Sequence, residues 1–355
     1  MTVPHTRYLL CRPHGGLNDT LVQLELCRRH AARFARTMIV DLSRSGLRLP
    51  FDDVFVAGPD FGAPVLGLTP DLARAFDDCT SVGPSHIAGR ISSYVAAWNA
   101  RADRTTERQS GAPVSFDFNR DHPETLIVHE EAGGGTRGFG FLRHVALAPA
   151  LADAIARRLI PLGQDYDSIH VRHTDLSTDY VALFENCRRL FAGRRLLVCS
   201  DSAEVKAHAG KVFDGGSILS AADIPDTSGL PLHQTEWTNP EKTTVDLLCD
   251  LLAIARGSTY VFTAVKSRDG RRPGFSGFSV LADMLRQRPA VLRGLLAKAD
   301  PALLSVLFET PHPQRRTGGI RHMLARLDQW RWNFPARRLS TRLGLKLRGG
   351  TLFSR

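Results

Sequence analysis

Residues 169–180, IHVRHTDLSTDY, place two imidazoles and a guanidinium at the point where an apolar segment turns polar. Side chains alternate across a strand, so His170 and Arg172 are expected on one face and the flanking aliphatic residues on the other. A guanidinium on an inward face is costly unless an anion neutralises it, and its planar fork matches carboxylate or phosphate. The segment predicts an anion site around Arg172, although a core histidine beside a salt-bridged arginine would give the same pattern.

A second segment, RPHGGLNDTL at residues 12–21, joins a strand end to a helix start. Gly15 and Gly16 permit close backbone approach, and either Asn18 or Asp19 suits a helix cap. The free N–H groups and positive dipole end of such a helix favour an anion. A tight turn with a capped helix and no ligand explains these residues equally well.

A third segment, RRLLVCSDSAEVK at residues 194–206, ends an apolar run at Ser200 and Asp201. A carboxylate at a strand end can accept hydrogen bonds from ribose hydroxyls or base N–H groups, while Ser202 caps the next helix. Asp201 could instead serve only that cap. Both interpretations fit the sequence.

The fourth segment, residues 259–285, runs from an apolar strand through a cationic, glycine-rich loop into SGFS and the helix that follows. Backbone amides and hydroxyls at a helix start suit phosphate oxygens, which favours Ser276, Gly277, Phe278 and Ser279 as ligands. The cations of the loop also fit a solvated charge run.

The elements that must position these segments alternate along the chain. Apolar runs at 7–11, 37–42, 125–130, 168–173, 195–200 and 259–264 predict strands, and residues 20–36, 148–159, 179–191 and 240–256 predict helices. This order predicts an α/β fold with parallel sheets covered on both faces, and a domain boundary in the Pro/Gly-containing stretch 161–166. Ligands then collect at the carboxyl ends of the strands, where the segments fall.

Composition limits the class of protein. The 355 residues are 43% hydrophobic and 23% charged, as in a globular protein, and neither a bilayer-length apolar run nor a leader peptide is evident, which predicts a cytoplasmic protein. Six scattered cysteines predict neither a disulfide framework nor a metal site. The sequence lacks GKS or GKT, GxGxxG, HExxH and GxSxG motifs, which disfavours standard kinases, dehydrogenases, zinc proteases and hydrolases.

The net charge of +10 is concentrated in residues 312–355, which hold eleven Lys and Arg and one acidic residue. The rest of the chain has 35 basic and 35 acidic residues and is neutral. Apolar residues from Ile320 to Trp330 recur there at helical spacing. Such a basic amphipathic tail fits the inner face of an anionic membrane, or a terminal helix that packs on the body. The neutral body disfavours nucleic acid as a partner.

Taken in order, GGLNDTL, HVRHTD, CSDS and SGFS resemble the motifs of the fucosyltransferase superfamily, whose members are GT-B glycosyltransferases. The resemblance implies two Rossmann-type domains facing a cleft: an acceptor domain at 1–163 and a nucleotide-sugar domain at 164–311, followed by the basic helical tail at 312–355. Two departures, Asn18-Asp19 for Gly-Asn and His173-Thr174 for Arg-Gly, leave the donor open between fucose and another sugar on GDP or UDP.

The resemblance also implies roles for individual residues. Arg172 is expected to hold the diphosphate of the donor, with GDP-fucose as the first choice, and Asp201 the nucleoside. The residues expected at the nucleotide-sugar site are Gly15, Gly16, Asn18, His170, Arg172, Asp175, Ser200, Asp201, Ser276, Gly277, Phe278 and Ser279. No cofactor and no metal ion are expected, because arginine and helix N-termini carry the leaving-group charge.

The expected reaction is inverting transfer of the sugar to a surface-glycan or lipid-linked saccharide acceptor. Arg172 and Asp19 are the expected catalytic residues, with Asp19 as the base, although Asp19 equally fits a simple helix cap; Glu130 and Glu131 are the reserve bases. The alternative is a non-enzymatic protein that binds nucleic acid or polysaccharide through its basic tail, which the neutral body and the lack of an aromatic platform disfavour.

Overall fold

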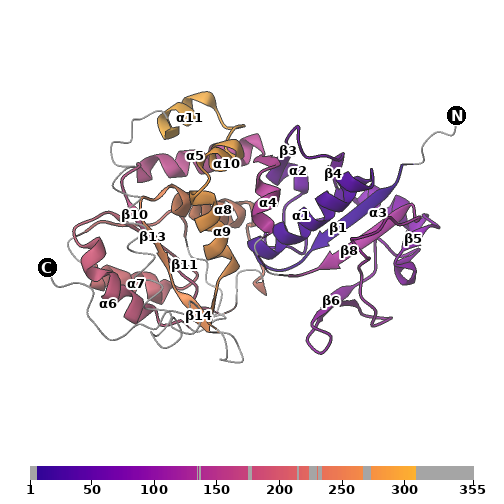
Figure 1. Ribbon diagram of the computed structural model, residues 1–355, viewed down its shortest axis with the longest axis horizontal. Helices are drawn as coiled ribbons and strands as arrows, with labels where there is room; N and C mark the ends of the chain where they lie inside the picture. Colours follow the sequence, from indigo (N-terminus) through magenta and orange to yellow (C-terminus); the bar gives the residue numbers. More distant parts are fainter. Residues whose placement is uncertain are drawn as a thin grey trace, which may run out of the picture. The chain divides into compact units, whose positions relative to one another are not determined.

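The computed structural model describes residues 6–133, 135, 137–174, 178–213, 216–223, 230, 234–266 and 273–308. They form two compact units (Figure 1). The first contains the described residues of Met1–Gly163, Ala221–Arg256 and Gly277–Pro311, and the second those of Gln164–Ser220 and Gly257–Ser276. This grouping places 221–256 and 277–311 with the first unit, whereas the sequence-based division puts them in the second domain; that division stays a prediction.

The first unit is built on a five-stranded parallel sheet with the order β4-β2-β1-β8-β5. Its strands are β1 (Tyr8–Pro13), β2 (Thr37–Val40), β4 (Val65–Gly67), β5 (Val82–Gly83) and β8 (Leu126–Glu131). Central β1 is apolar from Tyr8 to Cys11, and Leu9, Leu10 and Cys11 are fully buried. This continuous apolar run is what a parallel strand covered on both faces requires.

Nine α-helices accompany this sheet in the described part of the first unit. They are α1 (Leu17–Arg33), α2 (Phe51–Val54), α3 (Pro70–Asp77), α4 (Gly138–Leu142), α5 (Pro149–Leu159), α8 (Pro240–Arg256), α9 (Gly277–Arg286), α10 (Pro289–Leu295) and α11 (Pro301–Phe308). Helix α8 packs against α5 and α9, and an ion pair between Arg158 and Asp246 joins α5 to α8. The late helices therefore complete a unit that begins far earlier in the sequence.

Two antiparallel strand pairs extend this unit. Strands β6 (Ala96–Asn99) and β7 (Arg104–Glu107) form a hairpin that extends away from the sheet (Figure 1), and β3 (Phe55–Ala57) pairs with β9 (Val145–Leu147). The Glu131 carboxylate accepts a hydrogen bond of 2.8 Å from the backbone N–H of Thr105, which ties the hairpin to the end of β8. Short 3₁₀ turns at Ser85–Ile87 and Ile160–Leu162 complete the described elements.

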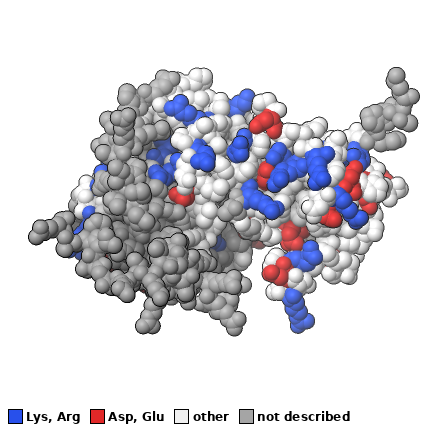
Figure 2. All heavy atoms as spheres, viewed as in Figure 1, with Lys and Arg blue, Asp and Glu red and all other residues white. Residues whose placement is uncertain are grey.

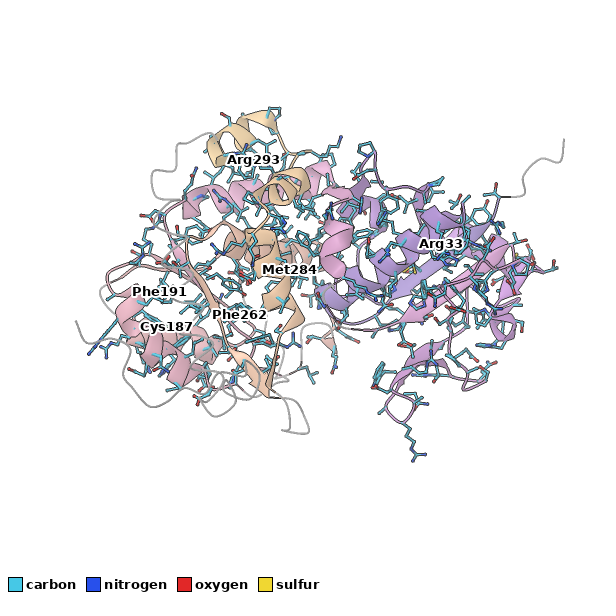
Figure 3. All side chains as sticks on the ribbon, in the orientation of Figure 1. Arg33, Cys187, Phe191, Phe262, Met284 and Arg293 are labelled. Atoms are coloured by element: carbon cyan, nitrogen blue, oxygen red, sulfur yellow. The ribbon has the colours of Figure 1, made fainter. Side chains whose placement is uncertain are left out.

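The second unit has a four-stranded parallel sheet with the order β12-β11-β10-β13. Its elements are β10 (Asp167–Val171), α6 (Tyr180–Phe191), β11 (Leu196–Ser200), α7 (Ala203–Val212), β12 (Ile218–Leu219) and β13 (Tyr260–Phe262), with the hairpin β14 (Ala264–Lys266) and β15 (Pro273–Phe275). Cys187 and Phe191 on α6 are buried in the core, and Phe262 on β13 packs against Phe275 (Figure 3). Both sheets with their helices confirm the predicted α/β class.

Charge on the described surface is mixed. On the face shown in Figure 2, acidic side chains lie among Lys and Arg over the first unit. No described helix combines the length and the apolar character needed to cross a bilayer. The basic tail, 312–355, lies outside the described residues, so both its helix and its membrane contact stay predictions.

Candidate functional site

The carboxyl end of the second sheet gathers the residues predicted around Arg172. Strand β10 ends at Val171, so Arg172 lies in the turn just after the strand and is partly buried. Val171 is in register with Ser200 at the end of β11, and His170 with Cys199. Ile169 and Val171 pack into the core with α6 and α7, and His170 lies outside that cluster. His170, Arg172 and Ser200 are predicted site residues. The adjacent carboxyl ends of β10 and β11 bring them together.

Asp201 fixes the turn that follows β10. Its Oδ1 accepts a hydrogen bond of 2.7 Å from the backbone N–H of His173, and its Oδ2 accepts one of 2.7 Å from the Thr174 hydroxyl. Ser202 occupies the N-cap position of α7 without a side-chain cap bond. Asp201 therefore orders the turn next to Arg172, a role that differs from assistance to the helix cap.

His170 is a neutral histidine beside a cation. Burial lowers its pKa to about 4, an effect that the charge of Asp201 opposes and that of Arg172 reinforces. Both charged side chains therefore act electrostatically on the imidazole. Because His170 is uncharged at neutral pH, the positive charge of this strand end comes from Arg172.

The glycine loop of the first unit follows β1 at the carboxyl end of its sheet. Gly15 has φ +88°, a left-handed value that favours glycine, and a Cβ there would lie 3.0 Å from Asp19 Oδ2. Gly46, which sequence analysis did not single out, packs against the same loop, since its Cβ would meet Gly15 O at 3.1 Å and Leu17 N at 3.2 Å. Ser45 also forms a parallel bridge with Gly15. The loop is thus held by residues about 30 positions away.

Helix α1 begins three residues earlier than predicted. Gly16 is its N-cap, with no side-chain cap bond, so neither Asn18 nor Asp19 caps the helix. Asp19 lies in the first turn, where the helix dipole stabilises a negative charge. The partly buried carboxylate of Asp19 therefore sits beside Gly15, and the simple cap interpretation is wrong.

Helix α9 begins at Gly277, in the same compact unit as the glycine loop. A Cβ at Gly277 would lie 2.6 Å from Asn18 Nδ2, so only glycine allows this approach. Asn18 Nδ2 also donates a hydrogen bond of 3.2 Å to Gly135 O. The structure thus brings Gly277 of the predicted SGFS turn together with Asn18, two residues that lie far apart in the sequence.

A buried carboxylate at the end of β8, Glu130, contacts three other side chains. Its Oε1 lies 2.6 Å from His14 Nε2 and 2.5 Å from Arg44 Nη1, and its Oε2 accepts a 2.5 Å hydrogen bond from the Tyr94 hydroxyl. Burial by itself would raise the pKa of Glu130, but these three partners outweigh burial and lower it. A carboxylate so heavily paired is a poor candidate for the base.

Glu131, the other reserve base, is also engaged. Its Oε1 accepts hydrogen bonds from the backbone N–H groups of Thr105, at 2.8 Å, and Ala132, at 3.0 Å. Its role in the structure is to anchor the β6–β7 hairpin.

The remaining predicted residues are divided. Phe278 and Ser279 follow Gly277 in the first turn of α9, and Ser276 is a buried residue at the end of the second unit. Asp175 and the cationic loop at 267–272 lie outside the described residues. The predicted roles of all these residues in ligand binding stay predictions.

The two α/β units, each built on a parallel sheet, correspond to a GT-B-type α/β protein. Neither a protein-family model nor a curated protein sequence matches the chain. Among solved structures, fucosyltransferase NodZ from Bradyrhizobium is similar, with a TM-score of 0.52 and 17% identity over 79% of this chain and 93% of that chain. Matches with lower TM-scores include POFUT1 in complex with GDP, at 0.47 and 10% identity over 81% of this chain and 96% of that chain. FUT1 from Arabidopsis thaliana, in complex with GDP, has a TM-score of 0.43 and 12% identity over 79% of this chain and 68% of that chain.

The likeness to NodZ confirms the predicted GT-B fold. This is the fold that the resemblance of the four motifs implied. A likeness at 17% identity supports the fold but assigns no role to any residue.

Proposed function

We propose that the chain is a glycosyltransferase that takes a sugar from a nucleoside diphosphate donor, with GDP-fucose as the first candidate. The observation that carries this is the arrangement of Arg172, beside the neutral His170, in a turn that Asp201 holds in place. A guanidinium at the carboxyl end of a parallel sheet suits the diphosphate of a nucleotide. The GT-B fold, shared with a protein whose name states fucosyl transfer, supports the choice of sugar.

In this proposal Arg172 offsets the negative charge that develops on the departing diphosphate. Ser200 and Asp201 lie on the nucleoside side of the donor, and the turn from Ser276 to Ser279 supplies further hydroxyl and amide contacts to phosphate. Transfer is proposed to invert the anomeric centre and to need no metal ion. The acceptor is proposed to be a saccharide, bound at the glycine loop of Gly15 and Gly16.

A thermal-shift screen tests the donor class, because a ligand that binds only the native chain raises its melting temperature. GDP should raise it more than UDP or CMP, and GMP, which lacks the second phosphate, should raise it less than GDP. A chain that no nucleoside diphosphate stabilises would contradict the proposal.

A further inference from the structure

The glycine loop of the first unit starts with a histidine, His14, whose ring contacts a buried carboxylate. His14 follows β1 directly, and its backbone N–H donates a hydrogen bond of 3.0 Å to Glu131 O. Its Nε2 lies 2.6 Å from Glu130 Oε1. The His14 side chain is 20% exposed, whereas that of Glu130 is fully buried. One edge of the imidazole is thus fixed inside the protein while the ring reaches the surface beside Gly15 and Gly16.

The partners of Glu130 determine the tautomer of His14. The Arg44 guanidinium and the Tyr94 hydroxyl both donate to Glu130, and its lowered pKa keeps it a carboxylate, which can only accept. Nε2 of His14 must therefore carry the proton in this contact, and Nδ1 is left with its lone pair. No described residue donates a hydrogen bond to Nδ1.

We infer that His14 is the general base of the proposed glycosyl transfer and that Glu130 is its positioning residue; the inference rests on the proposed function. An imidazole that is oriented through one nitrogen and open at the other is the usual arrangement of a general base. Asp19 is less suited, because the helix dipole stabilises its negative charge in the first turn of α1. Arg44 balances the charge of Glu130, so these two side chains together carry no net charge beside His14.

The step balances without a further reactant. The O–H bond of the acceptor breaks, and its proton moves to Nδ1 of His14. The acceptor oxygen forms a bond to the anomeric carbon of the sugar, while the bond from that carbon to the diphosphate breaks. The bonding electrons leave with the nucleoside diphosphate, and Glu130 stabilises the imidazolium that has formed.

The test uses the full chain with GDP-fucose, with water as the acceptor, and measures GDP release. His14→Gln keeps a donor toward Glu130 but lacks a basic nitrogen, so release should fall on the order of 100-fold while GDP affinity stays unchanged. His14→Ala should regain rate on addition of imidazole. His144→Gln is the control, because His144 lies in the same unit, its side chain is 18% exposed, and its Nδ1 lies 3.3 Å from an Asp60 carboxylate oxygen. It should keep the wild-type rate.

Two outcomes would overturn the inference. The first is full GDP release by His14→Gln together with loss of release in Asp19→Asn, which would make Asp19 the base. The second is an Nδ1–H tautomer of His14 in nitrogen NMR at neutral pH, since the inference requires Nε2–H. A chain that neither binds nor cleaves GDP-fucose would contradict the proposed function instead, and the tautomer then still decides whether His14 has the required lone pair.

Discussion

Asp201 Oδ1 accepts a hydrogen bond of 2.7 Å from the backbone N–H of His173, the residue that follows Arg172. Through this bond the end of β11 fixes the turn after β10. The Thr174 hydroxyl bonds to the other carboxylate oxygen, so two consecutive residues of the turn depend on one side chain. The backbone turn that carries Arg172 therefore depends on Asp201 as well as on its own strand.

Asp201→Ala should weaken GDP binding about tenfold or more, because hydrogen bonds to a charged group each contribute about 1.5–3 kcal/mol to ordering the turn. Thr174→Val removes only one of the two bonds and should weaken binding less. Isothermal calorimetry with GDP checks both variants. Equal affinities for wild type and Asp201→Ala would show that the turn does not depend on this carboxylate.

Gly15→Ala should destabilise the first unit by about 1–2 kcal/mol, because an L residue at φ +88° is strained. Gly16→Ala is the matched control: it is the adjacent glycine, its φ is −71°, and no atom lies within 4 Å of its Cβ position. That variant should change stability by no more than about 0.5 kcal/mol. Urea unfolding compares the two, and similar losses would contradict the strained loop.

Gly277→Ala should also be destabilising, by roughly 1–3 kcal/mol, because its Cβ would overlap the Asn18 side chain. In an Asn18→Ala background, Gly277→Ala should lower the free energy of unfolding by less. The coupling energy between the two substitutions should be about 0.5–3 kcal/mol. Gly294→Ala, on α10, has no atom within 4 Å of its Cβ and should be neutral or stabilising. A double-mutant cycle by urea unfolding measures the coupling, and strict additivity would mean that α9 does not pack on the glycine loop.

Local patterns in the sequence were enough to predict the central strands of both sheets and the long helices α1, α5, α6 and α8. The run at 195–200 became β11 (Leu196–Ser200), because a strand buried on both faces must be apolar throughout. Helix α8 (Pro240–Arg256) has the predicted bounds. Helix α1 starts at Leu17 and not at the predicted residue 20, because an uncapped glycine precedes it where preferences favour Asn or Asp.

Contacts between residues far apart in the chain could not be predicted from the sequence. Asp201 bonds to residues 27 and 28 positions earlier, and His14 meets Glu130 across 116 positions. The motif at Arg172 was visible because its residues are adjacent in the chain, whereas the pair of His14 and Glu130 exists only once β1 and β8 lie side by side. The histidine before two glycines was the one available signal for that pair.

His129 should make stability depend on pH. Burial lowers its pKa to about 4, with Glu130 opposing and Arg104 adding to the shift, whereas an unfolded histidine titrates near 6.5. The unfolded chain therefore binds a proton below about pH 6.5 that the native chain does not bind. The free energy of unfolding should fall as the pH drops from about 6.5 to about 4, by up to about 1.4 kcal/mol per pH unit, and this group should add no dependence above that range.

His129→Gln removes this titration, so the difference from wild type isolates it from the other buried histidines. Its side chain can still bond to Ser115 and Gln23, the partners of the imidazole. Urea unfolding at a series of pH values checks the prediction. Parallel curves for the variant and wild type between about pH 4 and pH 6.5 would contradict it.

The most direct measurement of the central claim is calorimetric titration of GDP into wild type, Arg172→Ala and Arg189→Ala. Arg189 is exposed on α6 of the same unit, so its removal changes the net charge equally without touching the turn. We predict that wild type and Arg189→Ala bind GDP alike and that Arg172→Ala binds about 100-fold more weakly, since a bidentate pair with phosphate is lost. Equal affinity of Arg172→Ala and wild type would contradict the account.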